Sequence, residues 1–205
     1  MKKLMMIAAM MLMSVGAFAQ EAGEMYIKPM VGGTMATVTN SDHAKFKLGF
    51  VGGAEFGYNI ADAFAVTAGA LFTMQGAKSE DTNHTKDAST TTTYINVPIM
   101  ANYYIAPGFA IKAGVQPGFL ISAKDKGSEN ISGTWVDYDR SGTDELKKVD
   151  FSIPVGLSYE FSDFVIDARY NIGLTNIIDS ALSDLTDTKI KNSVIMLTIG
   201  YKIPL

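Results

Sequence analysis

The chain of 205 residues has no cysteine, two histidines and a single tryptophan. The absence of cysteine excludes disulfide bonds, thiol catalysis and thiolate metal sites. The net charge is −4 and the acidic excess is not interrupted by a basic run, so the sequence does not indicate a nucleic-acid binder. After residue 20 there is no apolar stretch long enough to cross a bilayer as a helix. These absences leave exported β-rich proteins as the main class to consider.

The N-terminal segment has the pattern of a targeting sequence. Lys2 and Lys3 precede a short apolar run, and Ala17-Phe18-Ala19 follows it. A basic start, an apolar centre and an A-x-A site are typical of a secretory signal peptide. We therefore expect a signal peptide over residues 1–19 and one domain over 20–205, with a retained N-terminal membrane helix as the alternative.

The rest of the chain alternates between apolar and small or polar residues. This period of two predicts β-strands, and each segment exceeds the ~9–11 residues that a tilted strand needs to cross a bilayer. The predicted strands cover residues 24–39, 46–60, 64–77, 91–105, 109–123, 147–161, 164–177 and 190–204.

The connections alternate between short and long. Short ones lie at 60–63, 106–108 and 162–163, and long polar ones at 40–46, 77–90, 124–147 and 178–190. Short periplasmic turns and long outer loops are typical of outer-membrane barrels. The sequence therefore predicts an all-β fold, an eight-stranded antiparallel up-and-down transmembrane β-barrel after the signal peptide.

The segment "VIDARYNIGLTNI" (165–177) shows how charges fit such a barrel. Its even-numbered apolar residues would face lipid, and Asp167 and Arg169 would face the interior. Because a buried charge is costly unless it is paired, we expect a filled interior with matched charges and not an open channel. The expected interior polar network comprises Lys28, Glu55, Lys112, Gln116, Asp150, Asp167, Arg169, Asn171 and Lys202, with Glu160 as a further acid.

Aromatic residues gather beside the short turns. This placement predicts a girdle at the periplasmic interface, although aromatic residues are also ordinary strand formers. The expected girdle comprises Tyr58, Tyr103, Tyr104, Tyr159, Phe161, Phe164 and Tyr201.

Three stretches resemble the PorT-like outer-membrane β-barrel family: "YINVPIMANYY" (94–104), "IKAGVQPGFLISAK" (111–124) and "ARYNIGLTNI" (168–177). The resemblance implies an eight-stranded barrel in the outer membrane of a Gram-negative bacterium and implies no reaction. One branch of that family takes part in protein secretion across the outer membrane, and nothing in the sequence singles out that branch. The final "LTIGYKIPL" departs from the family, because an aromatic end is expected where Pro204 and Leu205 stand.

The chain offers little catalytic chemistry. His43 and His84 lie in predicted outer loops, and neither forms a recognisable triad with the nearby serines. Acidic loop stretches do not match a calcium-binding spacing. We therefore expect a non-enzymatic protein, with no catalytic, cofactor-binding or metal-binding residues.

Two aromatic residues, Trp135 and Tyr138, lie in the longest predicted outer loop. Exposed aromatics among polar residues favour a contact site, although the same side chains would also suit packing on the barrel rim. The expected role is structural or an interaction at the surface or in the envelope. The expected partners are outer-membrane lipid, the barrel-assembly machinery during biogenesis, and an envelope or extracellular protein or glycan, with no nucleic acid.

Two other functions remain open from the sequence. One is a barrel enzyme that modifies outer-membrane lipid and uses His84 or His43. The other is a soluble lipocalin-like periplasmic carrier, whose faces would be reversed, with apolar residues inside. Phe56→Arg separates the last reading from the membrane barrel, because it would hinder bilayer insertion by ~2–4 kcal/mol only if Phe56 faces lipid.

Overall fold

The computed structural model describes residues 21–39, 44–82, 84–143, 146–178 and 189–205. The predicted signal peptide and His43 lie outside these residues. The strands are β1 (Met25–Val38), β2 (Ala44–Ala61), β3 (Phe64–Ser79), β4 (Thr85–Asn96), β5 (Ile99–Ala106), β6 (Phe109–Ile131), β7 (Thr134–Ser141), β8 (Val149–Phe161), β9 (Phe164–Gly173), β10 (Asn192–Tyr201) and β11 (Ile203–Pro204). In the described part of the chain, no helix is long and apolar enough to span a membrane.

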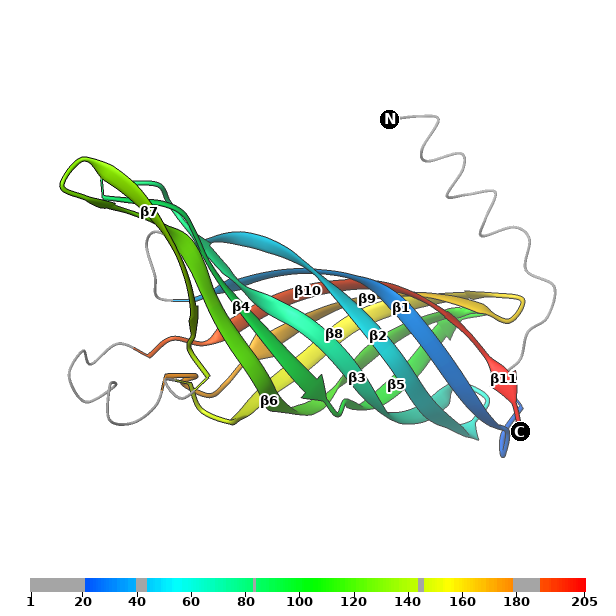
Figure 1. Ribbon diagram of the computed structural model, residues 1–205. Helices are drawn as coiled ribbons and strands as arrows, with labels where there is room; N and C mark the ends of the chain where they lie inside the picture. The colour runs from blue at the N-terminus through cyan, green and yellow to red at the C-terminus, as the bar shows by residue number, and fades with distance from the viewer. Residues whose placement is uncertain (1–20, 40–43, 83, 144–145, 179–188) are drawn as a thin grey trace.

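These strands close into an antiparallel ring with eight positions (Figure 1). Three positions hold two strands each: β4 with β5, β7 with β8, and β10 with β11. The interruption between β4 and β5 falls at Val97 and Pro98, and proline has no backbone donor for the ladder. Pairing of β1 with β10 completes the ring, so each of the eight positions has a neighbour on both sides.

The two faces of the wall differ in polarity. Along β9 the side chains alternate strictly between exposed and buried, with Ile166, Tyr170 and Ile172 outside and Asp167, Arg169 and Asn171 inside. Apolar residues on β8 and β10 face outward in the same way. The predicted faces are therefore confirmed for these strands, and the lipocalin-like carrier, which needs an apolar inside and a polar outside, is wrong.

The interior is not polar throughout. A cluster of buried apolar side chains lies within the lumen, formed by Met30, Ala36, Val51, Leu71, Val194 and Met196. The expectation of a polar plug therefore described only part of the lumen. Period-2 alternation separates the inner face from the outer face, and it does not require every inward residue to be polar.

The predicted loop at 124–147 is wrong, because most of it forms a hairpin. Strand β6 continues to Ile131, and β7 pairs with it from Lys124↔Ser141 to Ile131↔Thr134. Ser132 and Gly133 make the turn, with φ values of 52° and 88°. Positive φ at both central residues is the geometry of a two-residue hairpin turn. The hairpin projects beyond the barrel at the end away from the C-terminus (Figure 1).

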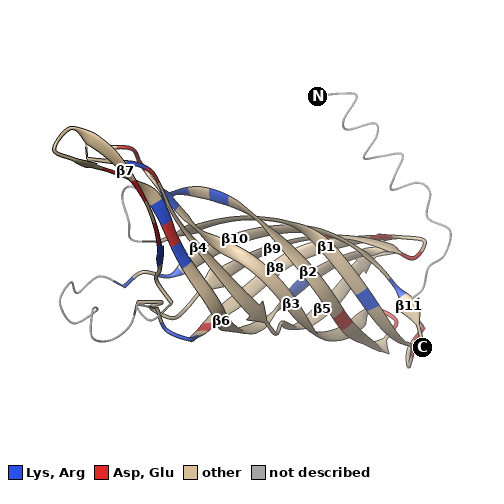
Figure 2. Cartoon of the chain, in the orientation of Figure 1, with Lys and Arg blue, Asp and Glu red and all other residues tan. Residues whose placement is uncertain are grey.

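Charged residues are unevenly distributed along the barrel. They are sparse on the middle of the strands and gather toward the end that carries β7 (Figure 2). We call this end the loop end. The opposite end, where the short turns 62–63, 107–108 and 162–163 lie and β11 pairs with the start of β1, we call the turn end.

Candidate functional site

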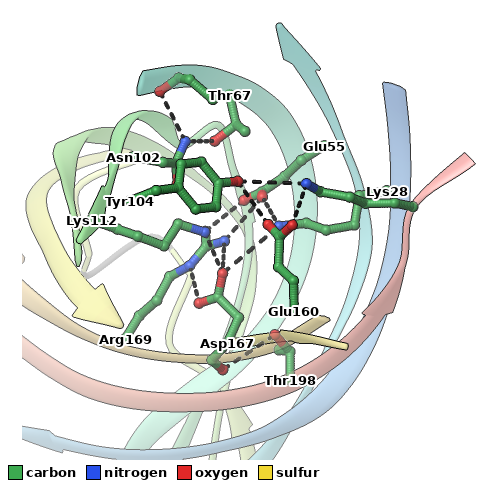
Figure 3. A network of polar contacts seen from close by, with 12 residues as sticks. Lys28, Glu55, Thr67, Asn102, Tyr104, Lys112, Glu160, Asp167, Arg169 and Thr198 are labelled. Carbon is green, nitrogen blue, oxygen red and sulfur yellow. Dashed lines mark hydrogen bonds and ion pairs between the residues drawn. The ribbon is translucent and has the colours of Figure 1, made fainter. Parts of the chain in front are cut away.

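An ion cluster crosses the lumen, with Arg169 at its centre (Figure 3). The Arg169 guanidinium donates to both carboxylate oxygens of Glu55, at 2.5 Å from Nη1 and 3.0 Å from Nη2. It also donates from Nε to Oδ1 of Asp167 at 2.7 Å. The planar guanidinium suits such paired contacts, and two carboxylates on different strands are thereby joined across the barrel.

Two lysines complete this cluster. Lys28 lies 2.9 Å from Oε2 of Glu55 and 3.8 Å from Oδ2 of Asp167, and Lys112 donates to Asp167. All five side chains are almost fully buried. Burial of these ions is costly, and the many short contacts offset that cost only while each partner is present.

Glycines make room for the cluster. A Cβ added to Gly69 would lie 2.6 Å from Cγ of Glu55, and one added to Gly156 would lie 3.1 Å from Cγ of Arg169. Gly156 pairs directly with Lys112 on one side and with Arg169 on the other. The long charged side chains therefore fill the lumen space that larger neighbours would occupy.

Lys202 belongs to a second cluster, nearer the turn end. Its Nζ lies 2.5 Å from Oε2 of Glu160 and 4.4 Å from the centroid of the Tyr26 ring. The Tyr104 hydroxyl donates to Oε1 of Glu160 at 2.7 Å. The placement of Tyr104 in the outer girdle is therefore wrong, because the side chain points inward; its neighbour Tyr103 is exposed, as strand alternation requires.

The remaining predicted residues, Gln116, Asp150 and Asn171, lie together on the loop side of the ion cluster. Their positions on β6, β8 and β9 follow Lys112, Gly156 and Arg169 toward the loop end. They line one narrow chamber. The structure thus divides the predicted network into three groups, and Tyr26 and Tyr104 join it although neither was expected there. The sequence could have indicated Tyr26, because it lies two residues before Lys28 in β1 and therefore points to the same face.

The predicted contact residues Trp135 and Tyr138 lie on the β6–β7 hairpin. The side chain of Lys86 lies 4.4 Å from the Trp135 ring, and Arg140 lies 4.8 Å from the Tyr138 ring. Trp135 is 38% exposed. Nearby, Lys126 hydrogen-bonds to Asp139 and lowers the pKa of that carboxyl group.

A cleft of about 450 Å³ opens beside the hairpin. Its walls include Thr85, Thr90, Asp125, Glu129, Tyr138 and Arg140. The Thr90 hydroxyl donates to Oδ1 of Asp125 at 2.5 Å. The cleft therefore presents hydroxyl, carboxylate and guanidinium groups next to one aromatic ring.

The part of the chain that the structure describes contains no cluster of side chains suited to holding a metal ion. No group of three or more His, Asp or Glu side chains converges there. The His84 backbone N–H donates to the Thr82 hydroxyl at 3.3 Å, and the Asn130 backbone N–H donates to the His84 carbonyl at 2.9 Å.

Comparison with known proteins gives a family match and a set of structural likenesses. The family model described as "Outer membrane protein beta-barrel domain" matches residues 18–179. No curated protein matches the chain. Among solved structures, Ail, the attachment invasion locus protein of Yersinia pestis, in complex with the heparin analogue sucrose octasulfate, is 19% identical, with a TM-score of 0.50 over 89% of this chain and 100% of that one. Neisserial surface protein A is 13% identical, with a TM-score of 0.48 over 87% and 97%. OprG of Pseudomonas aeruginosa is 15% identical, with a TM-score of 0.42 over 90% and 98%.

Proposed function

The chain belongs to the family of outer membrane protein beta-barrel domains, and from this premise we propose that it is a non-enzymatic contact protein of the bacterial surface. The cell is Gram-negative, and the signal peptide at residues 1–19 directs export before it is cleaved. Outer-membrane lipid surrounds the barrel wall, and the barrel-assembly machinery inserts it. The loop end faces the outside, where it meets an extracellular protein or glycan.

The observation that carries this proposal is the β6–β7 hairpin with its adjoining cleft. The hairpin holds Trp135 and Val136 exposed, and aromatic residues are over-represented at contact sites. Among the described residues, strand β7 pairs with β6 alone, so its second edge offers backbone donors and acceptors. Both features serve recognition and neither serves the stability of the barrel ring.

The lumen supports a contact role over a transport role. Glu55 on β2 meets Asp167 and Arg169 on β9 across the lumen, because Arg169 donates to both carboxylates. A solute moving along the barrel axis would have to separate these buried ion pairs, which is costly. A narrow eight-stranded barrel is in any case filled by its own side chains.

The cleft chemistry favours a polar ligand such as a glycan. Sugar hydroxyls pair with the carboxylates and hydroxyls that line it, and Tyr138 supplies an aromatic face for the apolar side of a sugar ring. A protein partner would instead engage the free edge of β7 by strand addition. The two partner classes therefore use different parts of the hairpin.

A pair of variants tests the proposal. We expect Tyr138→Ala to abolish binding of whole cells to a glycan array, while Trp135→Ala leaves glycan binding within about twofold because Trp135 contacts Lys86 and does not line the cleft. A protein cross-link that forms from a photo-reactive residue at position 136 on β7, with no glycan of the array bound, would favour the protein partner. Unaltered binding of every ligand by a hairpin deletion would refute the contact role.

The enzyme alternative depends on histidine. We propose that neither His43 nor His84 acts in catalysis, since the family resemblance implies no reaction and neither histidine stands in a recognisable triad motif of the sequence. Lipid profiles of the outer membrane should be the same with the wild-type chain and with His43→Ala/His84→Ala. A lipid species that disappears only in the double variant would establish the enzyme.

The narrower assignment to the PorT-like branch is also our proposal. It is supported by the motifs at 94–104, 111–124 and 168–177, which fall on β4–β5, β6 and the end of β9. Deletion of the gene should reduce secretion of proteins across the outer membrane if the chain belongs to the secretion branch. Normal secretion in the deletion strain would restrict the role to surface contact.

A further inference from the structure

The chamber lined by Gln116, Asp150 and Asn171 has a composition that the contact role does not use. It lies in the lumen, and Ser152 and Asn192 contribute to its wall. Its volume is about 10 Å³, which is room for about one water molecule or one small ion. An occupant of this size must pair with the polar atoms of these residues.

Asp150 brings a buried charge without a basic partner. The residue is 8% exposed. Its carboxylate accepts hydrogen bonds from the Thr175 hydroxyl and, at 2.8 Å, from the Asn192 amide, which are both neutral. In the described part of the chain no Lys, Arg or His forms an ion pair with it. This contrasts with Glu55, Asp167 and Glu160, whose carboxylates each contact a lysine or arginine.

The amide oxygens beside Asp150 are also without partners. Oε1 of Gln116 and Oδ1 of Asn171 are buried and accept no hydrogen bond, although each residue is only 3% exposed. A buried acceptor that is left unpaired costs about 1–3 kcal/mol. The chamber therefore holds two amide oxygens that lack a donor and one carboxylate that lacks a positive partner.

The orientation of both amides is fixed by their other contacts. The Ser152 hydroxyl donates to the Gln116 backbone carbonyl at 3.3 Å, so the Gln116 side-chain NH₂ must be the donor in its 3.3 Å contact with the Ser152 oxygen. The Asn171 NH₂ donates to Sδ of Met196 at 3.0 Å. Each amide therefore uses its nitrogen on the wall and keeps its oxygen for the chamber.

A cation satisfies these groups better than the alternatives. A water molecule would donate to two of the oxygens and leave the charge of Asp150 uncompensated. A calcium ion requires 6–8 oxygen ligands, and its second charge would have no acid to balance it. A single monovalent charge neutralises Asp150, and amide oxygens are hard ligands of the kind that such ions prefer.

We propose that the chamber binds one monovalent cation of about the size of Na⁺, held by the Asp150 carboxylate, Gln116 Oε1 and Asn171 Oδ1. This site goes beyond the surface-contact role and is independent of it. The ion ties β8 to β6 and β9 inside the lumen. Because the ion binds the folded barrel and not the unfolded chain, occupancy stabilises the barrel in proportion to the cation concentration.

Thermal unfolding of the full mature barrel in neutral detergent tests the site. The midpoint is measured in NaCl, KCl, LiCl, CaCl₂ and choline chloride at matched ionic strength, since choline is too large for the chamber. We expect a saturable rise in the midpoint with Na⁺ that choline does not reproduce. We expect Asp150→Asn, which keeps the shape and removes the charge, to lose that rise while matching or exceeding the wild-type midpoint in choline.

Glu160→Gln is the matched control, because it also neutralises an interior carboxylate, but one that already pairs with Lys202. It should retain the Na⁺ response. The ²³Na NMR linewidth, followed while the wild-type barrel is titrated with NaCl, supplies a readout that does not depend on any variant folding, and a saturable broadening is expected. Equal wild-type midpoints in every salt, or no broadening, would mean that water alone occupies the chamber and would overturn the proposal. A response to Ca²⁺ but not to Na⁺ would overturn the monovalent assignment.

Discussion

Arg169 makes bidentate contacts with two buried carboxylates that Lys28 and Lys112 meet only through single ammonium groups. Its partners Glu55 and Asp167 have almost no solvent contact, and Lys28 and Lys112 cannot replace a bidentate guanidinium. Removing one member of a buried ion pair costs about 3–5 kcal/mol, because the remaining charge stays desolvated. We therefore expect Arg169→Met to lower the free energy of unfolding by about that amount, as measured by urea titration of the barrel in lipid vesicles.

The control at this scale is Arg140→Met on the hairpin. Arg140 is exposed and forms a long ion pair of 3.9 Å with the exposed Glu129, so we expect a change within about 0.5 kcal/mol. Equal stabilities of the two variants would show that the interior cluster contributes nothing to the barrel.

At the scale of single elements, we expect the barrel wall to fold and keep its stability without the β6–β7 hairpin. Strand β6 pairs with β8 from Phe109 to Phe119, and β4 pairs with it from Asn96↔Gly118 to Thr90↔Asp125, so only the last three β4 pairs, at Lys126, Ser128 and Glu129, involve the hairpin. We expect replacement of residues 126–139 by an Asn-Gly turn to leave the heat-dependent gel mobility of the barrel intact and its unfolding free energy within about 1 kcal/mol, while surface binding is lost. Failure of this variant to fold would mean that the hairpin is part of the folding unit.

The outer wall gives a second prediction for its strands. Leu197, near the middle of β10, and Ile131, at the hairpin tip, are similarly exposed, at 59% and 56%. An arginine near the bilayer midplane costs about 2–4 kcal/mol and one outside the membrane about 0–1. Leu197→Arg should therefore lower the unfolding free energy in vesicles by the larger amount and Ile131→Arg by the smaller. Equal costs would place the membrane boundary elsewhere on the wall.

At the scale of the whole molecule, the orientation in the membrane follows from the unequal ends. Ser132 at the loop end and Ser162 at the turn end have nearly the same φ, 52° and 51°. The chain has no cysteine, so a single introduced thiol gives no background. We expect an impermeant maleimide to label Ser132→Cys in intact cells and to label Ser162→Cys only after the outer membrane is permeabilised. The reverse pattern would invert the barrel and remove the basis for a surface role of the hairpin.

The sequence by itself determined the strand pattern and the two faces of the wall. Alternation is a local property, because successive side chains of a strand point to opposite sides, so Asp167 and Arg169 were placed inside from their neighbours alone. The hairpin was missed because both of its faces meet water at the loop end, where no apolar alternation marks a strand. The turn at Ser132 and Gly133 was its only local signal.

Tertiary structure decided which interior residues meet. Arg169 and Glu55 are 114 positions apart, and their contact depends on how far each strand is staggered against the next around the whole ring. The same stagger brings Tyr26 and Tyr104 to Lys202 and leaves Asp150 beside amides and not beside a lysine. Acids and bases can be counted in a sequence, but two inward side chains of a closed barrel pair only if they lie at similar heights along the barrel axis. Height is the sum of all strand registers, and no single segment contains it.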